Sequence, residues 1–522
     1  MSKTRRLIHE ELTYSDAKNK ETNILQKLSY PTQQAQFFTL LQSKCSWIRV
    51  IVAHHLNLPS ANSCQVADVS EWLHGSFNVC IPVTILGWNQ KQQLGDRVLV
   101  RFPLPYRIGE NSRPGNSDEK VRCEAGTYAW LEENCPEIPI PRLYGFAMAT
   151  GETFTRIENL PILTRWMRRL HHRILLLLGC STPSRYIRHQ RKIELPGGQL
   201  NVGYLVIEYI EETRGKMLSS TWSLNRDDVK LRTNLFQDLS RIYLSLYRTP
   251  LPRIGSFVIE NDGFTRLKNR PLSLGIQDLE NECIPTDMPR DYTYSTVDSY
   301  VVDTLFLHDS RIRHQPNAIN DLADYIYQTS SLTTMRAIFP LFFRRDLRRG
   351  PFIFSLTDLH QSNIFVDENW NITSLVDLEW ACSLPVEMIQ PPYWLTNTAV
   401  DQIVSSEYNK IRLEFMSALT TEESSASYTP CEDFPVLLKL SQIMSAAWDQ
   451  GTFWYSLALS SPTGLFAIFD KELQPKFIDK CPDHDAFHEI MPWYWAHDIV
   501  AIVTRKIADK KAYDIQLRNE FE

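Results

Sequence analysis

One stretch, residues 352–381, constrains the fold of this 522-residue chain more than any other. Residues 364–366 and 372–376 within it are short runs of β-forming side chains, and polar residues typical of a turn separate them. Two such runs joined by a short turn predict an antiparallel hairpin, here centred on Trp370. The hairpin interrupts a region that is otherwise mainly helical in pattern.

Polar side chains gather at the open end of this hairpin. With Trp370 at the centre, Asn363 before the first strand stands opposite Asp377 after the second, and Asp358 lies on the loop that leads in. Mg²⁺ prefers oxygen ligands and keeps few protein contacts, so one Asp and one Asn can hold it against phosphates. A second Asp can orient an acceptor hydroxyl and take its proton. The set predicts magnesium-assisted phosphoryl transfer.

Residues 357–367, which read TDLHQSNIFVD, resemble the G-D-L-H-P-G-N-I-L-V-D run of the aminoglycoside phosphotransferase and choline kinase family. Residues 376–380, VDLEW, resemble its I-D-W-E-W segment. The resemblance implies an α+β, two-lobed, protein-kinase-like fold with a β-rich N-lobe and a mainly helical C-lobe. It also implies transfer of the γ-phosphate of ATP, assisted by Mg²⁺, to a hydroxyl of a small molecule. Asp358 would be the catalytic base, and Asn363 and Asp377 the metal ligands.

Two features depart from the family pattern. Leu356 stands where a His is usual, and Gln361-Ser362 replaces the usual Pro-Gly. The motif with these departures resembles that of a divergent branch of the family, which is common among filamentous fungal proteins of unassigned substrate. The alternative function is therefore a catalytically silent, kinase-like binding or scaffold module. The two retained carboxylates and the amide favour the enzyme, and the absence of D-F-G and A-P-E motifs argues against a protein kinase.

A kinase-like fold needs a basic residue on a central strand to hold the α- and β-phosphates. Arg101, in the β-rich run 97–102, stands where the family has Lys. Arg97 and Lys91 are alternatives for this cation, and a solvated strand Arg is the alternative for Arg101. Glu124 shares the apolar face of a predicted helix, where a carboxylate needs a partner, and Arg101 is the candidate.

Two weaker features complete the predicted cofactor-binding set. Gly75 lies in a turn before a strand, and backbone N–H groups there can cap a phosphate. A plain turn is the alternative. Glu208 and Ile210 end the apolar strand 203–210, and in this fold the linker that follows offers backbone hydrogen bonds to adenine. A simple connection between the lobes is the alternative.

The predicted secondary structure changes twice along the chain. Residues 1–64 form a predicted helical extension, with apolar side chains at helical spacing over 22–58. Residues 65–210 are rich in β-forming runs and make the predicted nucleotide-binding N-lobe. Residues 211–522 are mainly helical, with one clear helix over 229–247, and make the predicted C-lobe with the catalytic loop and the acceptor site. A β-rich part followed by a helical part is typical of the α+β class.

An apparent insertion in the N-lobe, residues 156–192, carries nine Lys or Arg against one acid, Glu158, so its local charge is +8. Residues 165–178 within it also carry Trp166 and an apolar run. A basic amphipathic helix lies on a membrane surface or binds an acidic partner. The alternatives are an insertion docked on the chain's own acidic lobes, or an interaction protein whose working part is this insertion.

Composition narrows the remaining classes. The chain has 55 Lys and Arg residues and 61 Asp and Glu residues, and the resulting net charge of −6 argues against general nucleic-acid binding. The ten scattered cysteines form no C-x-x-C pair, which favours a reducing compartment over a zinc or disulfide framework. No stretch reaches the ~18 apolar residues that a transmembrane helix needs. The first residues lack the apolar core of a secretory signal. We therefore expect a cytoplasmic protein.

The acceptor is not fixed by the fold, since family members act on antibiotics, choline-like alcohols, sugars and other metabolites. An aminoglycoside acceptor would need an acidic pocket. The region 433–515 is rich in large aromatic side chains, which either line an acceptor pocket or belong to the core: Trp448, Trp454, Trp493, Tyr494 and Trp495.

Overall fold

The structure is a computed structural model that describes residues 3–88, 96–189, 200, 202–425, 438–478 and 484–522. Its first large element is an antiparallel sheet with strand order β3-β5-β6-β10-β7-β8-β9 and with β4 paired to β5. The strands are β3 (Cys64–Val66), β4 (Leu73–His74), β5 (Asn78–Ile85), β6 (Arg97–Pro103), β7 (Leu143–Ala147), β8 (Thr153–Arg156), β9 (Tyr186–Arg188) and β10 (Tyr204–Glu208). Residues 89–95, whose polar sequence favours a turn, lie outside the described residues.

Helices cover both faces of this sheet. One face packs against α4 (Cys45–Leu56) and α3 (Tyr30–Ser43), and the other against α6 (Asn116–Asn134). Side chains alternate between the faces along a strand. On β6 the even-numbered Val98, Val100 and Phe102 enter the core beside α4, so Arg101 points to the side of α6. Because helices cover both faces of the strand, the Arg101 side chain is buried, and the exposed fraction of Arg101 is 2%.

The second half of the chain is mainly helical, as predicted. The predicted helix 229–247 is α9 (Val229–Tyr247), and the Asp228 side chain accepts hydrogen bonds from Lys230 N and Leu231 N at its start. The other helices are α8 (Leu218–Asn225), α10 (Leu274–Asn281), α11 (Val297–His314), α12 (Leu322–Phe342), α13 (Ser405–Ser425), α14 (Leu440–Gln450), α15 (Thr452–Ser460), α16 (Leu465–Ile468), α17 (Pro475–Ile478), α18 (His484–Ile490) and α19 (Ile499–Phe521).

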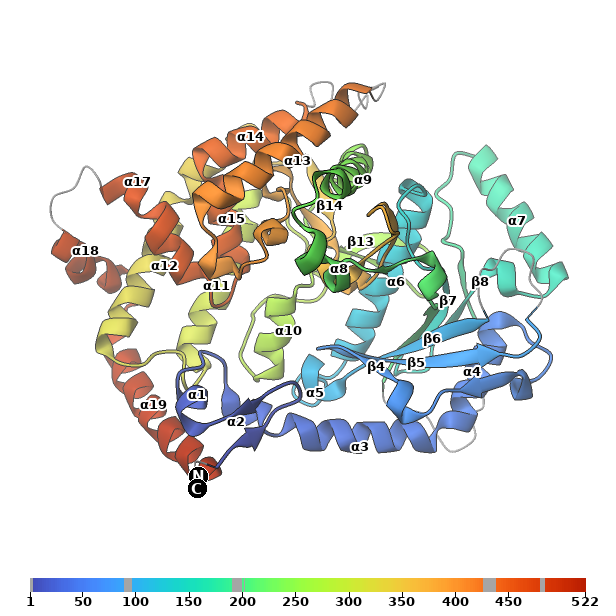
Figure 1. Cartoon of the computed structure of the whole chain (residues 1–522), viewed down its shortest axis with the longest axis horizontal. Helices are drawn as coiled ribbons and strands as arrows, with labels where there is room; N and C mark the ends of the chain where they lie inside the picture. Colours follow the sequence, from blue (N-terminus) through green and yellow to red (C-terminus); the bar gives the residue numbers. More distant parts are fainter. Residues whose placement is uncertain (1–2, 89–95, 190–199, 201, 426–437, 479–483) are drawn as a thin grey trace.

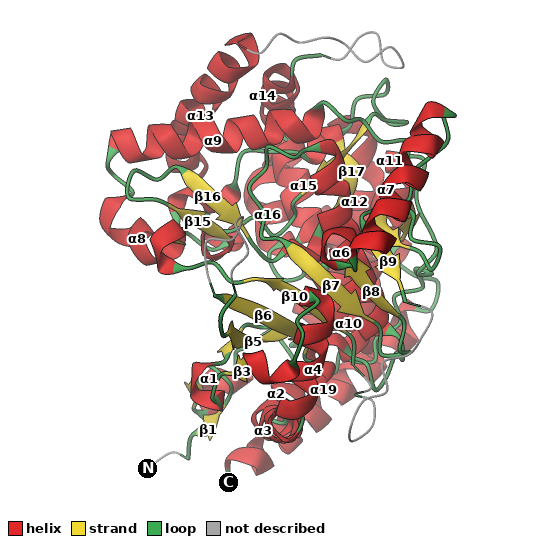
Figure 2. Cartoon of the chain, turned by 90° about the vertical axis from the view of Figure 1, so that its right-hand side faces the viewer, coloured by secondary structure: helices red, strands yellow, loops and turns green. Residues whose placement is uncertain are grey.

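Small strand pairs lie inside this helical part. β14 (Phe352–Ser355) pairs with β17 (Cys382–Pro385), and β12 (Ser256–Ile259) pairs with β13 (Thr265–Asn269). The predicted hairpin is β15 (Ile364–Val366) with β16 (Ile372–Leu375), and β11 (Lys216–Met217) adds to its edge. Figure 2 shows the hairpin above strands β6 and β10 of the large sheet. The catalytic loop predicted between β14 and β15 therefore faces the sheet that carries Arg101.

The N-terminal extension touches both parts of the molecule. α3 and α4 pack on the sheet, whereas α2 (Ile24–Lys27) packs on α19 together with β1 (Arg5–Arg6), β2 (Glu11–Leu12) and α1 (Tyr14–Lys18). The Ile24 amide donates a hydrogen bond to the Tyr513 hydroxyl at 2.9 Å. Figure 1 shows the two termini side by side. The extension is helical over most of 22–58, as predicted.

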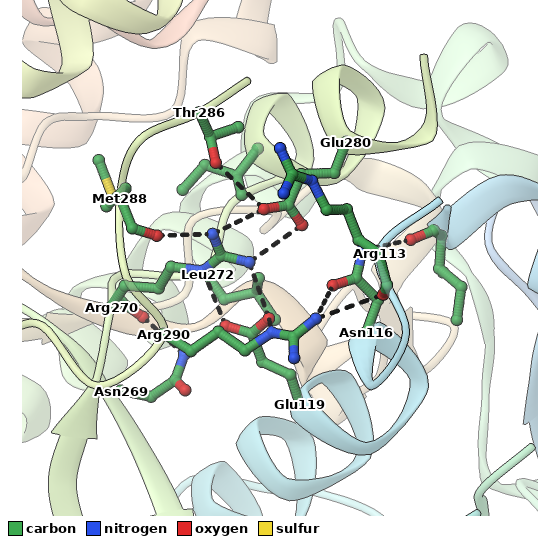
Figure 3. A network of polar contacts seen from close by, with 12 residues as sticks. Arg113, Asn116, Glu119, Asn269, Arg270, Leu272, Glu280, Thr286, Met288 and Arg290 are labelled. Carbon is green, nitrogen blue, oxygen red and sulfur yellow. Dashed lines mark hydrogen bonds and ion pairs between the residues drawn. The ribbon is translucent and has the colours of Figure 1, made fainter. Parts of the chain in front are cut away.

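A buried ionic network fixes α6 to the helical part (Figure 3). The Arg270 guanidinium donates to Glu119 of α6, with Nε and Nη2 both 2.8 Å from its carboxylate oxygens. The same guanidinium donates to Glu280 of α10 at 2.8 and 3.0 Å. Arg290 adds a further bond to Glu119 at 3.1 Å. Glu119 directly precedes Lys120 and lies five residues before Glu124. By fixing Glu119, the network therefore also orients the face of α6 that is turned towards Arg101.

The α+β, two-lobed class is confirmed, with a β-rich N-lobe and a mainly helical C-lobe. A covered antiparallel sheet, an inward helix carrying a Glu beside the central strand, and a helical lobe with a loop-hairpin site make the protein-kinase-like arrangement. Gly, Pro, Asn and Ser are frequent in 106–117 and favour a loop, but this segment begins within one helical turn, α5 (Pro105–Ile108). The basic insertion contains α7 (Ile162–Leu177), which projects from the body in Figure 1. The exact domain boundaries remain predictions.

Candidate active site

The hairpin does not have the symmetrical register predicted from the sequence. Ile364 pairs with Leu375, and a bulge between Phe365 and Val366 shifts the pairing by one residue. The Val376 amide donates to the Asn363 carbonyl at 2.9 Å, so Val376 stands opposite Asn363. The prediction that Asn363 faces Asp377 directly is therefore wrong by one position. Asp377 is the next residue, so the two side chains still lie at the open end of the hairpin.

Asp377 leaves the strand in a left-handed conformation, with φ 58° and ψ 58°. This conformation is unfavourable for a residue other than Gly, and such residues cluster at functional sites. It turns the chain out of β16 into the short 3-10 helix η6 (Leu378–Trp380). The Asp377 side chain keeps 43% of its surface exposed. It is the accessible carboxylate of the site.

Asp358 and Asn363 are held together by the loop between β14 and β15. The Asn363 amide nitrogen donates to the Asp358 backbone carbonyl at 2.9 Å and to its Oδ2 at 3.2 Å. Burial, together with the nearby carboxylates of Glu379 and Asp377, raises the pKa of Asp358 from 3.8 to about 7. A carboxyl group with that pKa is poised to accept a proton near neutral pH.

Arg101 joins the sheet to the hairpin. Its Nη1 lies 2.5 Å from Asp377 Oδ1, and its Nη2 lies 2.6 Å from Glu379 Oε2. Nη1 is also 3.4 Å from Glu124 Oε1, so the predicted pairing of Arg101 with Glu124 is confirmed. Arg101 is not the solvated strand residue of the alternative interpretation. One guanidinium contacts three carboxylates.

The two buried glutamates differ in charge. Burial raises the pKa of Glu124 to about 7, and neither of its carboxylate oxygens has a hydrogen-bond partner among the described residues. Burial also opposes ionisation of Glu379, but the cations Lys120 and Arg101 lower the pKa of Glu379 to about 2. Glu379 is therefore the fixed negative charge of the site, whereas Glu124 gains its charge near neutral pH.

Lys120 and Asn78 are site residues that no sequence motif predicted. Lys120 of α6 forms an ion pair with Glu379 and donates to Asn78 Oδ1 at 2.9 Å. The Asn78 amide nitrogen donates to Glu379 Oε2 at 2.7 Å. The available signal was the spacing on α6, because Lys120 lies one helical turn before Glu124 and shares its face. The site thus holds a second buried cation beside Arg101.

The structure shows where the amide of Gly75 is used. Gly75 lies in the turn between β4 and β5, and its own amide donates to the Asn78 carbonyl at 3.0 Å. That N–H group closes the turn, so it is not free to cap a phosphate. A Cβ at this position would meet nothing within 4 Å, so space does not require Gly there. The alternative interpretation of a plain turn fits.

Glu208 and Ile210 lie at the end of β10, where the sheet meets the helical part. The Glu208 carboxylate accepts from Arg214 Nη1 at 2.7 Å and from the Arg142 amide at 3.0 Å. Its side chain therefore braces the connection. Arg97 is also used at this connection, because it pairs with Glu211 and lies over the Tyr209 ring. Arg97 is thus not the cation at the carboxylate cluster, and Lys91 lies outside the described residues.

Two adjoining cavities lead to the carboxylates. A narrow one contains Asp358 and Asp377 in its wall. The other, of about 200 Å³, shares Leu356, Thr357 and Leu359 with it and extends toward Tyr393 and Phe453. Among the described residues, the lining of the larger cavity contains no Asp, Glu, Lys, Arg or His. A wider hollow of about 860 Å³ lies along α19, but none of the site carboxylates lines it.

The five aromatic side chains singled out in 433–515 do not line this cavity. Trp448 and Trp454 pack in the core, Trp495 is buried, and Trp493 and Tyr494 are exposed. Pocket aromatics come instead from Tyr243, Tyr300, Tyr393, Trp394 and Phe453. The core interpretation therefore holds for three of the five predicted residues.

The donors present fit a magnesium ion that is also held by phosphates. Among the described residues, no group of three or more His, Cys, Asp or Glu side chains is placed to hold a metal. Mg²⁺ at a phosphate site commonly takes one or two carboxylates and completes its shell with phosphate and water oxygens. The side-chain nitrogen of Asn363 donates hydrogen bonds to Asp358, so the side-chain oxygen of Asn363 stays available to bind a cation. Asp377 supplies an exposed carboxylate beside it.

No protein-family model and no curated protein matches the chain. Similar solved structures include a type I macrolide 2'-phosphotransferase, 12% identical, with a TM-score of 0.31 over 77% of this chain and 88% of the other. An ethanolamine kinase of Plasmodium vivax is 13% identical, with a TM-score of 0.36 over 89% and 88%. A macrolide 2'-phosphotransferase of Brachybacterium faecium is 9% identical, with a TM-score of 0.30 over 80% and 96%. At these TM-scores, the function proposed below rests on the chain's own residues.

Proposed function

We propose that this chain is a phosphotransferase that moves the γ-phosphate of ATP to a hydroxyl of a small molecule. The observation that carries the proposal is the meeting of Asp358, Asn363 and Asp377 beside two buried cations, Arg101 and Lys120. Phosphoryl transfer asks little covalent chemistry of a protein, and positioning with charge neutralisation supplies most of the rate. These residues are the parts that such a site needs.

Each residue then has a role. Asn363 and Asp377 would hold Mg²⁺, which would supply positive charge to neutralise the nucleotide phosphates. Arg101 and Lys120 supply positive charge toward the same phosphates from the sheet and from α6. Asp358 accepts the proton of the acceptor hydroxyl. Its raised pKa supports this role, because a general base works best when its pKa lies near the working pH.

We assign the nucleotide base to the edge of β10. The chain leaves the sheet there at Glu208 and Ile210, and Glu208 is braced by Arg142 and Arg214. A fixed backbone can offer hydrogen bonds to an adenine ring without further ordering. This placement puts the base at the connection between the lobes and the phosphates toward Arg101.

The cavity beside Asp358 indicates the class of acceptor. Its uncharged lining of aliphatic and aromatic side chains with a few hydroxyls suits a neutral molecule with an apolar body. A polycation such as an aminoglycoside needs carboxylates, which the described lining lacks. The Ser456 hydroxyl lines the cavity and has no hydrogen-bond partner among the described residues, so it can contact a polar group of the acceptor. We therefore assign a neutral, largely apolar alcohol.

A specific contact favours a second candidate, a catalytically silent binding module. Asp377, the assigned metal ligand, is already paired with Arg101, and the Gly75 amide is already used within its turn. A module that binds without transferring phosphate would keep such a closed network. The two functions differ in whether a phosphate is transferred to an acceptor hydroxyl.

The test is the thermal unfolding of the purified chain with ATP, with and without Mg²⁺. A ligand that binds only the folded state raises the transition temperature, even when its affinity is weak and millimolar nucleotide is needed. We expect a shift that requires Mg²⁺ and is lost in Asp377→Ala. Glu368→Ala is the matched control, because Glu368 is an exposed acid in the turn of the same hairpin.

A screen of hydroxyl compounds for ATP consumption then separates the two candidates. Phosphorylation of a neutral apolar alcohol, absent in Asp358→Asn, supports the enzyme. A Mg²⁺-dependent shift without phosphorylation of any acceptor class would favour the silent module. No shift in a folded protein would contradict the nucleotide site itself.

A further inference from the structure

The helix α7 is amphipathic, and its apolar side faces solvent. Apolar residues recur at helical spacing at Leu163, Trp166, Leu170, Ile174 and Leu177, which defines one face. These side chains are exposed, with exposed fractions of 71% for Trp166 and 86% for Leu177. A helix that belongs only to its own protein packs this face inward. α7 has no buried residue at all.

The opposite side of α7 lies against the body. Thr164, Arg165, His172 and Leu175 are its partly buried residues, and Arg165 donates to the Leu160 carbonyl at 3.1 Å. The helix is therefore docked by its mostly polar side, with its apolar side turned outward. Such an orientation is stable only if something else covers the apolar face.

The base of the insertion is rigid. The helix leaves β8 and returns through β9, and these two strands pair with each other at the edge of the sheet. Arg156 at the end of β8 pairs with Glu132 and Glu158, and Tyr186 at the start of β9 is buried. The paired strands β8 and β9 thus hold α7 in place with its apolar face in solvent.

The charge of α7 points to an anionic partner. The helix contains Arg165, Arg168, Arg169 and Arg173 with two histidines and no acid. Among the described residues, the salt bridges of the insertion involve Arg156, Arg185 and Arg188, and none involves an arginine of α7. The interpretation that the insertion docks on the chain's own acids therefore applies to its base alone.

A basic cavity lies beneath the helix. It has a volume of about 460 Å³, and its lining includes Arg168, His171, His172, Arg188 and His189. One acid, Asp262, also lines it, but Asp262 pairs with Arg266 at 2.8 Å. The cavity can therefore accept an anion on the side of the helix that is turned away from the apolar face.

We propose that α7 docks on the surface of a bilayer that contains anionic phospholipids. The apolar face enters the boundary between headgroups and acyl chains, while Arg169 and Arg173 at its border reach the lipid phosphates with their long side chains. No helix among the described residues is long and apolar enough to cross a membrane, so α7 lies in the plane of the interface. Anionic lipid adds electrostatic attraction to the apolar contact.

The experiment is sedimentation of the full chain with vesicles of phosphatidylcholine alone or of phosphatidylcholine mixed with phosphatidylserine. We expect the chain to sediment with the mixed vesicles, less so at high salt, and not with phosphatidylcholine alone. The double variant Trp166→Glu with Leu170→Glu should lose binding by about tenfold or more. Arg169→Gln with Arg173→Gln should remove the salt-sensitive part of the binding.

The matched control is Leu341→Glu with Ile515→Glu, two exposed apolar residues on α12 and α19. We expect it to bind vesicles like the parent chain. All substituted side chains are exposed, so the unfolding temperature of each variant should stay near that of the parent. Equal sedimentation of the parent and the Trp166→Glu/Leu170→Glu variant would overturn the proposal. So would a folded parent chain that binds neither vesicle, which would leave an acidic protein as the occupant of the face.

Discussion

The Arg101 guanidinium lies 2.5 Å from Oδ1 of Asp377, and its other terminal nitrogen lies 2.6 Å from Glu379. One side chain on the sheet thus holds both the assigned metal ligand and the buried acid that follows it two residues later. A planar guanidinium can make both contacts at once, which the single ammonium group of Lys does less well. An Arg at this position therefore suits a bridging role. A nucleotide with Mg²⁺ must share Asp377 with Arg101 or displace it.

The stability of the chain should depend on the ionisation of Asp358. The folded state raises the pKa of Asp358 from 3.8 to about 7, so the folded chain binds this proton more tightly than the unfolded chain. The resulting stabilisation is complete below about pH 4 and is lost as the pH rises through about 7. Asp358→Asn cannot ionise. We expect it to be more stable than the parent at pH 8, by about 1–2 kcal/mol, and to lose this advantage at low pH.

Urea unfolding of both proteins from pH 5 to pH 8, without Mg²⁺ or nucleotide, measures this difference. Asp303→Asn is a useful reference, because Asp303 accepts a hydrogen bond from Tyr294 outside the site. A difference between Asp358→Asn and the parent that stays constant with pH would contradict the raised pKa.

Lys120 should matter for both folding and nucleotide binding. Lys120→Met removes one of the two cations that neutralise buried Glu379, and we expect a loss of about 3 kcal/mol in the free energy of unfolding. Adding Glu379→Gln to Lys120→Met should recover part of that loss, because the buried charge goes with it. The ATP-induced thermal shift should stay small in the double variant. Full recovery of the shift would show that Lys120 has only a structural role.

Two arginines on the same segment should differ strongly when removed. Arg270 is buried between Glu119 and Glu280, so Arg270→Ala leaves two buried acids and should cost about 3–5 kcal/mol. Arg266 of β13 is partly exposed and forms ion pairs with Glu260 and Asp262. Because such pairs contribute little, Arg266→Ala should lower the free energy of unfolding by about 1 kcal/mol or less. Chemical denaturation of both variants compares them. Similar losses would mean that the network in Figure 3 does not fix α6.

The acceptor cavity should be separable from the nucleotide site. Ser456→Phe fills the apolar cavity next to Asp358, and we expect the KM for the acceptor to rise by about tenfold or more. The Mg²⁺- and ATP-dependent thermal shift should stay unchanged, since Ser456 touches no assigned nucleotide residue. Ser424→Phe, at an exposed position on α13, is the control. Equal KM values for Ser456→Phe and the parent would place the acceptor elsewhere.

Local sequence signals were enough for the parts of the fold that short stretches determine. The helix predicted at 229–247 has those bounds in the structure, and the strand runs before and after Trp370 form the predicted hairpin. Helical spacing and β-forming runs reflect the propensities and the burial pattern of neighbouring residues. The loop that carries Asp358 and Asn363 was found for the same reason, because both residues belong to one short motif.

The sequence could not give the register of the hairpin. A symmetrical turn at Trp370 would place Asn363 opposite Asp377. Val366 pairs instead with Ile372, so the turn is centred on residue 369, and the bulge between Phe365 and Val366 then places Val376 opposite Asn363. A bulge depends on how the strands pack and twist against their surroundings, and a one-residue change leaves almost no trace in the spacing.

By itself, the sequence determined the two-lobed α+β class, the short motif with Asp358, Asn363 and Asp377, and the basic amphipathic character of α7. Only the tertiary structure brought Asn78, Lys120 and Glu379 together, because contacts between distant residues follow from packing and from the need to pair buried charges. Periodicity defines the faces of a helix but not the direction in which each face points. The structure alone therefore decided that the apolar face of α7 points into solvent.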